Sequence, residues 1–189
     1  RLMHIPFYYC SDYHCSVMAK TENQPIRFSI IRAKDAPDFA ECDMMTQQPL
    51  TEVETEGSIA AHDAGMLEGA TLRVLFQMPG MSLTHVWFKS GFPLPRHSHD
   101  TDCLYYILAG SLRIGTEELG IGDGFFVGAH VPYTYTPGEQ GVELLEYRSS
   151  NAFDIKLLAN NPNWWSKAVG TIAERRPEWD SEKPPSSMN

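Results

Sequence analysis

The middle of the chain alternates short apolar segments with residues that favour turns. The apolar segments are rich in β-branched and aromatic residues, and Gly, Pro, Asn or Asp separates them, as is typical of β-strands joined by turns. Strands are predicted at residues 27–32, 72–77, 83–89, 103–108, 111–114, 118–120, 125–127, 133–136 and 142–148. Turns are predicted at residues 109–110, 115–117, 121–124 and 137–141. Short strands at this spacing predict an all-β sandwich or barrel.

Two other segments have a different pattern. Residues 35–66 are mixed and acidic, and they predict irregular structure with one short strand. Residues 163–176 carry apolar side chains at helical spacing and therefore predict one amphipathic helix. These side chains are Trp164, Trp165, Ala168 and Ile172.

The patterns divide the chain into four parts. Residues 1–17 are unlike the rest and are predicted to be a poorly ordered N-terminal extension. Residues 18–150 hold the strands and are predicted to form a single β-domain. Residues 151–176 are predicted to be a C-terminal helical segment, and residues 177–189, rich in Pro, Ser and Lys, a loose tail.

Composition and charge narrow the classes of partner. The chain has 189 residues, 42% of them hydrophobic and 21% charged, with a net charge of −9. A strongly acidic protein lacks the basic surface that phosphate binding needs, so nucleic acid is excluded and small molecules or proteins are expected. No apolar run approaches the roughly 20 residues of a membrane helix, so no membrane partner is expected. The N-terminus does not resemble a secretory signal, and four cysteines imply no disulfide framework, so a cytoplasmic location is expected.

The strongest chemical pattern is a pair of histidines within a frame of glycines. His97 and His99 lie two residues apart, so an extended backbone places both imidazoles on one face, where they can share a metal ion. Gly91 precedes the pair, and Cys103 and Gly110 follow it. This spacing resembles the first motif of the cupin superfamily, Gly-x5-His-x-His-x3,4-Glu-x6-Gly, with Cys103 in place of the glutamate ligand.

A second cupin motif, Gly-x5-Pro-x-Gly-x2-His-x3-Asn, resembles the sequence from Gly122 onward more loosely. Gly128 stands in the proline position and His130 in the second glycine position. Tyr133 stands in the histidine position and Pro137 in the asparagine position. The resemblance covers roughly residues 71 to 148 and implies an all-β cupin jelly-roll β-barrel, or double-stranded β-helix, with one C-terminal helix.

The resemblance also implies a metal site whose ligands would be His97, His99 and Cys103. A thiolate with two imidazoles suits soft or borderline metals, and a divalent metal ion, zinc or iron, is expected. His130 is a further candidate ligand if its loop turns it inward, and a rim residue otherwise. Cys103 is equally consistent with a small buried apolar residue. The alternative for the whole site is a barrel that kept the fold and lost the metal.

Tyrosines add candidate acid–base groups. Tyr133 is predicted to be a catalytic acid or base, or a phenolate ligand. Tyr133 and Tyr135 alternate along one predicted strand and therefore face the same side. They either line the cavity or are ordinary core aromatics with satisfied hydroxyls. Glu143 and Glu146 are the nearest spare carboxylates, and alternation allows only one of them to face inward.

The resemblance implies that the barrel encloses a small-molecule ligand. Its expected apolar walls are Phe88, Tyr105, Ile107, Phe126 and Leu144. The first hypothesis is a metal-binding enzyme of the oxygenase, isomerase or lyase class. The alternative is a non-catalytic cupin, with or without a metal, that binds or senses a small molecule. The third hypothesis is a protein whose main role is assembly. Pairing of two copies through their sheets would make it a homodimer. His85 is predicted to be a satisfied core or surface histidine.

Overall fold

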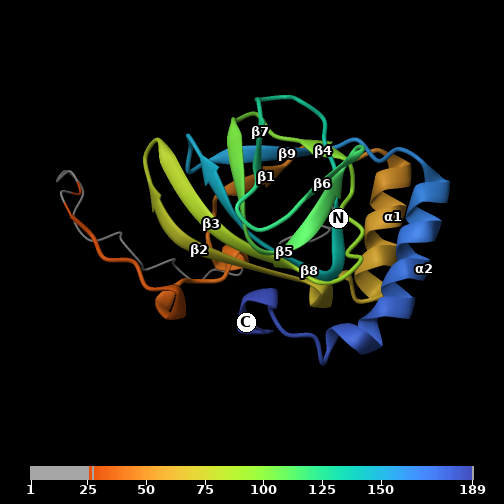
Figure 1. The fold of residues 1–189 in the computed structure, drawn as a ribbon. Helices are drawn as coiled ribbons and strands as arrows, with labels where there is room; N and C mark the ends of the chain where they lie inside the picture. Colours follow the sequence, from red (N-terminus) through yellow and green to blue (C-terminus); the bar gives the residue numbers. More distant parts are fainter. Residues whose placement is uncertain (1–25, 27, 189) are drawn as a thin grey trace.

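Two β-sheets face each other across the interior, and two helices pack at one end of them (Figure 1). The computed structural model describes Ile26 and residues 28–188, so the predicted extension at residues 1–17 lies outside the described part. The predicted β-rich fold is confirmed. The sheets are hydrogen-bonded separately, however, and they do not close into the predicted barrel. No helix in the described residues is both long and apolar enough to span a membrane.

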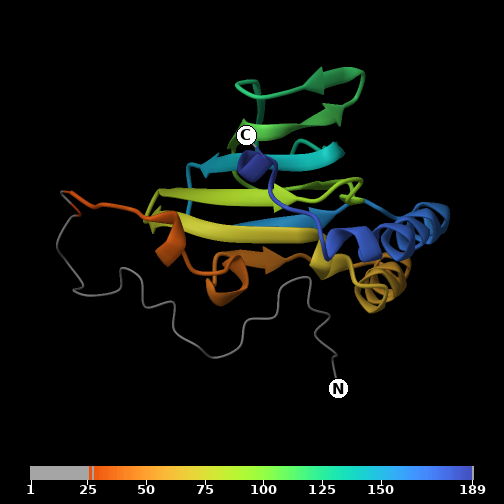
Figure 2. The ribbon, with the colours of Figure 1, turned by 60° about the horizontal axis from the view of Figure 1, so that its bottom comes forward.

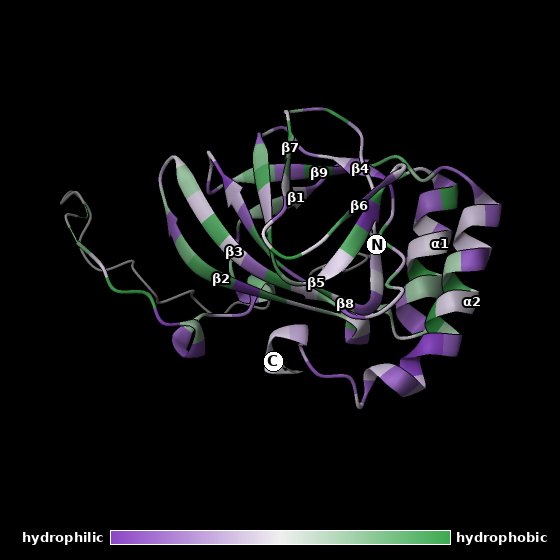
Figure 3. Ribbon diagram, viewed as in Figure 1, coloured by the Kyte–Doolittle hydropathy of each residue, from purple (hydrophilic) through white to green (hydrophobic). Residues whose placement is uncertain are grey.

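The larger sheet has six strands in the order β2-β3-β8-β5-β6, with β7 also paired to β5, and all its pairs are antiparallel (Figure 2). Its strands are β2 (Ala70–Met78), β3 (Met81–Phe88), β5 (Cys103–Ile114), β6 (Glu117–Leu119), β7 (Gly124–Val127) and β8 (Thr136–Arg148). Each strand overlaps a segment predicted from the apolar pattern, because these strands bury one face and their sequences alternate accordingly. Figure 3 shows this alternation of polar and apolar residues along the sheet.

The smaller sheet has three short strands, β1 (Met45–Gln47), β9 (Phe153–Leu157) and β4 (His97–Ser98). β9 lies in the middle, parallel to β1 and antiparallel to β4. The sequence predicted neither β4 nor β9, and β9 falls within the segment predicted to be helical. Its residues do alternate between apolar and polar, with Phe153 and Leu157 buried, so a periodic signal was present. β4 has only two residues and is too short to be read from periodicity.

Two predicted turns are wrong, because a β-bulge looks like a turn in sequence. β5 continues through the predicted turn at residues 109–110, where Gly110 has φ 72° and the pairing with β8 shifts register. A Cβ at Gly110 would lie 2.2 Å from the carbonyl oxygen of Gly141, so only glycine fits this bulge. Residues 137–141, also predicted as a turn, belong to β8.

Two predicted strands are also wrong. Residues 133–136 were predicted as a strand, but Tyr133 makes only an isolated bridge to His97, and the ladder of β8 begins at Thr136. The first predicted strand covers residues 27–32. Its described part, residues 28–32, forms no strand. Their apolar side chains, such as Phe28 at 83% exposure, have no sheet partner in the described residues.

Helix α1 (Glu52–Asp63) lies in the segment predicted to be irregular, and α2 (Pro162–Trp179) confirms the predicted C-terminal helix. α1 has weak amphipathic periodicity, and Gly57 in its middle lowers helix propensity. The signal that could have revealed it is the capping box, in which Thr51 accepts from the backbone N–H of Glu54 and the Glu54 carboxylate accepts from that of Thr51.

Four 3₁₀ helices complete the described structure: η1 (Ala33–Asp35), η2 (Phe39–Glu41), η3 (Met66–Gly69) and η4 (Pro185–Met188). η4 lies in the segment predicted to be a loose tail, yet it packs against β5 and β8. The backbone N–H of Ser186 donates to Glu143 at 2.7 Å, and the Glu182 carboxylate accepts from the backbone and hydroxyl of Ser90. These contacts hold the C-terminal residues on the outer face of the larger sheet.

The contact between the helices gives a test of the packing. Gly57 of α1 lies directly under the indole of Trp165, and a Cβ there would be 2.2 Å from the ring. Gly57→Ala is expected to destabilise the fold by about 1–3 kcal/mol through overpacking, although alanine is the better helix former. Urea unfolding measures the effect.

The matched control is Gly170→Ala, at an exposed position inside α2 with nothing within 4 Å of the new Cβ. This variant is expected to gain up to about 1 kcal/mol. Equal stability changes in the two variants would contradict the packing described for Gly57.

Candidate functional site

A cavity of about 370 Å³ lies between the two sheets. β1, β2, β3, β8 and β9 all contribute to its walls, together with η2, η3 and the segments around β4. Most of the lining side chains are apolar, among them Leu72, Phe88, Phe92, Phe153 and Leu157. The polar side chains on the walls are Asp38, His97, His99, Tyr133, Tyr135, Glu146 and Arg148. This combination is typical of a site for a small organic molecule.

Backbone contacts hold the two histidines in place. The backbone of His97 exchanges hydrogen bonds with that of Tyr133, at 3.0 and 2.9 Å. The Nδ1 atom of His97 lies 2.7 Å from the carbonyl oxygen of Pro95, and that of His99 lies 2.5 Å from the carbonyl oxygen of Asp154 in β9. Because a carbonyl can only accept, each Nδ1 carries the proton, and each Nε2 keeps its lone pair.

Both imidazoles are neutral at physiological pH. Burial lowers the pKa of His97 to about 4, and the positive charge of Arg148 adds to the effect. Burial likewise lowers the pKa of His99 to about 2, with further contributions from Arg148 and His97. The ring centroids of the histidines are 5.0 Å apart, so the site presents two neighbouring neutral acceptors.

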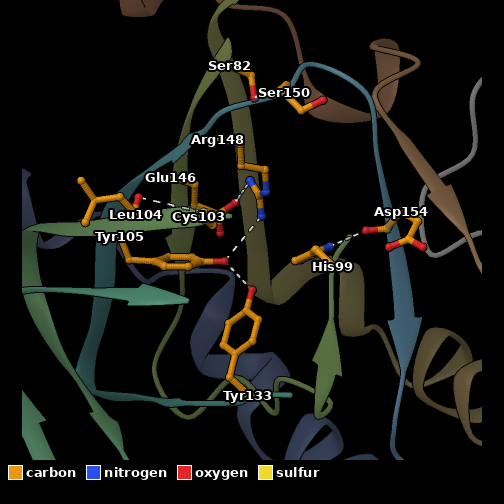
Figure 4. Close-up of polar contacts among 10 residues, drawn as sticks. All are labelled: Ser82, His99, Cys103, Leu104, Tyr105, Tyr133, Glu146, Arg148, Ser150 and Asp154. Atoms are coloured by element: carbon orange, nitrogen blue, oxygen red, sulfur yellow. Dashed lines mark hydrogen bonds and ion pairs between the residues drawn. The ribbon is translucent and has the colours of Figure 1, made fainter. Parts of the chain in front are cut away.

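Two phenols meet beside the histidines. The hydroxyls of Tyr105 and Tyr133 are hydrogen-bonded to each other, as Figure 4 shows. The ring of Tyr133 lies 4.4 Å from that of His97, centroid to centroid. Burial raises the pKa of both phenols well above the usual value, so both are protonated. Tyr133 lines the cavity, and Tyr105 lies behind it in the core.

An ion pair lies on the same wall. Arg148, at the end of β8, is 3% exposed, and its Nη1 lies 2.6 Å from Glu146 (Figure 4). The guanidinium carbon lies 4.4 Å from the centre of the Phe153 ring, and Nη2 lies 3.5 Å from the Tyr105 hydroxyl. The buried Nε atom of Arg148 has no hydrogen-bond partner.

The structure brings some of the predicted site residues together and leaves others apart. His97, His99 and Tyr133 line one cavity. Cys103 is buried and pairs with Arg148 in the β5–β8 register, but it does not line the cavity. Burial raises the pKa of its thiol to about 12. His130 is exposed in a loop with φ 64°, and its backbone N–H donates to the backbone carbonyl oxygen of His99 at 2.6 Å.

These donors do not fit a divalent zinc or iron ion. Among the residues that the structure describes, no three His, Cys, Asp or Glu side chains are grouped to hold a metal. His97 and His99 have the tautomer that a ligand needs, but Cys103 does not line the cavity and the side chain of His130 is exposed, so neither joins them.

The walls differ from those predicted. Phe88 lines the cavity, whereas Ile107 and Leu144 are buried in the core behind it, as Tyr105 is. The prediction for Phe126 is wrong, since this side chain lies on the outer face at 64% exposure.

Glu143 and Glu146 of β8 face opposite sides of the sheet, as alternation requires. Glu146 lines the cavity. Glu143 is also buried, but it lies under the C-terminal residues, 3.2 Å from the Nε2 of His85.

Sequence reasoning missed Arg148, Phe153 and Asp154. Arg148 follows Glu146 by two residues, so the same alternation that turns Glu146 inward also turns Arg148 inward, and that signal was available. Phe153 and Asp154 belong to β9, whose place beside β4 depends on pairing between segments far apart in the chain.

Comparison with known proteins found matches among solved structures. No protein-family model matches the chain, and no curated protein matches its sequence. Solved structures that match include the polyketide cyclase RemF from Streptomyces resistomycificus, with 16% identity, TM-score 0.49 and coverage of 77% of this chain and 98% of RemF. An RmlC-like cupin from Shewanella frigidimarina has 23% identity and TM-score 0.40, covering 44% of this chain and 78% of that one. The oxalate decarboxylase of Bacillus subtilis has 19% identity and TM-score 0.43, covering 48% and 28%. The structural neighbours are cupin-fold proteins.

The buried histidines predict a loss of stability in acid. In the unfolded chain each histidine takes up a proton as the pH falls below about 6.5, whereas His97 and His99 stay neutral in the fold until the pH approaches 4 and 2. Between pH 7 and pH 5 each is expected to cost about 2 kcal/mol of folding free energy. Urea unfolding at several pH values in this range measures the slope of the unfolding free energy against pH.

His99→Asn is expected to reduce that slope by about half of the combined effect of the two histidines. The control is His62→Asn, which removes a histidine whose side chain is 45% exposed and should leave the slope in place. A slope that His99→Asn leaves unchanged would show that His99 is not held neutral in the fold.

Proposed function

We propose that the protein binds a small organic molecule in the cavity between its sheets, and that binding needs no metal ion. The observation that carries the proposal is the combination of apolar walls with one group of buried polar side chains. An apolar body can lie against Phe88, Phe92 and Leu157, and a polar group can reach His97 and Arg148. The cavity of about 370 Å³ is large enough for a molecule of one or two fused rings.

The absence of a metal from the proposal follows from the chemistry of the donors. A cation would meet two imidazole lone pairs beside the Tyr133 phenol and the Arg148–Glu146 ion pair, and no three His, Cys, Asp or Glu side chains are grouped to hold it among the described residues. The same groups suit an organic ligand, because phenols and a guanidinium donate hydrogen bonds and neutral imidazoles accept them. The donors and acceptors on the cavity wall therefore favour the hypothesis of a metal-free binding cupin over that of a metal-dependent enzyme.

Binding of a neutral fluorescent naphthyl ketone, prodan, tests the proposal. Saturable binding is expected with and without EDTA. Leu67→Trp should weaken it by about tenfold or more, because Leu67 lines the cavity and is half exposed, so a larger ring can block access without breaking the core.

The control for this variant is Leu104→Trp. Leu104 is equally exposed, at 49% against 50%, but it lies on the outer face of β5 away from the cavity. Its variant should bind prodan as the unaltered protein does. Loss of binding on adding EDTA would contradict the metal-free site, and equal effects of both variants would show that prodan binds elsewhere.

A second candidate function is proton transfer on the bound molecule. The geometry supports it, because the Nε2 lone pairs of His97 and His99 can accept a proton and the neighbouring Tyr133 hydroxyl can donate one. Burial makes the histidines weaker bases and Tyr133 a weaker acid than usual, since it lowers the pKa of the first and raises that of the second. In this role Tyr133 and the two histidines would be catalytic, and Tyr105, hydrogen-bonded to Tyr133, would orient it. An isomerase or lyase could work in this way without a metal.

Hydrogen–deuterium exchange separates this function from binding alone. The methyl protons of bound 2-acetylnaphthalene, followed by NMR in D₂O, are expected to exchange faster with the protein than without it. His99→Asn should lower the rate by roughly the 10²–10⁴-fold that general-base catalysis supplies. Exchange that the protein does not accelerate would leave the site with a binding role only.

The predicted homodimer is also retained as a proposal. Large apolar side chains are exposed on the outer face of the larger sheet, among them Leu104, Tyr106, Phe126 and Tyr147. Leu104 is paired in register with both Phe126 and Tyr147, so these three side chains are neighbours on one face. An apolar group of this kind supports pairing of two copies through their sheets.

A further inference from the structure

We infer that the ligand of this cavity carries a carboxylate and that Arg148 binds it. The inference rests on the proposed function, because it names the class of molecule that the cavity would take. Arg148 is the only Lys or Arg among the residues that line the cavity in the described structure. The ligand would therefore place its anionic group at this wall and its apolar part among the aromatic rings.

The hydrogen-bonding capacity of Arg148 exceeds what its protein partners use. A guanidinium has five N–H donors. One ion pair, from Nη1 to Glu146 at 2.6 Å, is short, and the contact of Nη2 with the Tyr105 hydroxyl is long at 3.5 Å. Nε is buried without a partner. Buried donors are normally satisfied, so the remaining capacity indicates a missing acceptor.

The guanidinium is also held in a fixed position. Its carbon lies over the ring of Phe153 at 4.4 Å, which restricts the plane of the group. The hydroxyl of Ser82 donates to the carbonyl oxygen of Ser150 at 2.7 Å and ties down the chain just beyond β8, as Figure 4 shows. A planar group in a fixed position is suited to a carboxylate, which it can bind through two parallel hydrogen bonds.

The charged side chains on the described cavity wall are Arg148 and two carboxylates, Glu146 and Asp38. Arg148 is therefore the group on this wall that can bind an anion. Glu146 is already ion-paired with Arg148, so its carboxylate competes with the carboxylate of a ligand for the same guanidinium. Glu146 therefore limits the affinity for an anion, and its removal should strengthen binding of an anion without changing binding of a neutral molecule of the same shape.

Isothermal titration calorimetry with 2-naphthoate and 2-naphthamide at pH 7 tests this directly. The two probes have the same ring system and differ in charge. The unaltered protein is expected to bind naphthoate about tenfold more tightly, since a hydrogen bond to a charged group exceeds a neutral one by that order. Glu146→Gln should tighten naphthoate binding further, by about fivefold or more, and leave naphthamide binding unchanged.

The matched control is Glu143→Gln, which alters a buried carboxylate on the same strand but on the opposite face, next to His85. It should change the affinity for neither probe. Arg148→Lys keeps the charge but loses the planar fork, and it should weaken naphthoate binding more than naphthamide binding. This variant also serves as the test if Glu146→Gln does not fold.

The outcomes separate the inference from the proposed function. If naphthoate, naphthamide and prodan all fail to bind, the cavity is not a ligand site, and both the proposed function and the carboxylate inference are wrong. If naphthamide binds as tightly as naphthoate, or if Glu146→Gln and Arg148→Lys leave the ratio of the two affinities unchanged, the proposed function stands and the carboxylate is wrong.

Discussion

The buried charge of Arg148 is the constraint on which the cavity depends. An arginine that is 3% exposed loses its hydration and costs several kcal/mol unless the fold supplies partners. β8 supplies Glu146, two residues away on the same face, and β9 supplies the ring of Phe153. Arg148 thus joins the larger sheet to the smaller one, and its position decides where the polar end of the cavity lies.

The histidines line the cavity beside that charge. Backbone carbonyls of Pro95 and Asp154 hold the protons of His97 and His99 on Nδ1. The same geometry would prepare the imidazoles for a metal, but no three His, Cys, Asp or Glu side chains are grouped to hold one among the described residues. The Tyr133 phenol and the Arg148 guanidinium give the wall hydrogen-bond donors for an oxygen acceptor.

The first motif combines two separate requirements. Its glycines serve the backbone, because Gly91 and Gly110 have φ values of 64° and 72° and Gly110 forms the bulge of β5 against β8. Its side chains serve the chemistry of the cavity. The glycine frame can therefore specify the fold while the Cys103 and Tyr133 positions change, so a motif of this kind predicts architecture more securely than it predicts a bound metal.

The sequence by itself determined the strands of the larger sheet, α2 and the histidine pair, since burial of one face imposes a local period that can be read along the chain. It also determined that Glu143 and Glu146 face opposite sides. Only the tertiary structure decided that β4 and β9 form a second sheet, that Gly110 is a bulge and that Cys103 lies off the cavity. Those features depend on contacts between residues far apart in sequence, such as His99 with Asp154 and Arg148 with Phe153. No local pattern records such contacts, because each segment alone satisfies several pairings, and only packing the sheets together selects one.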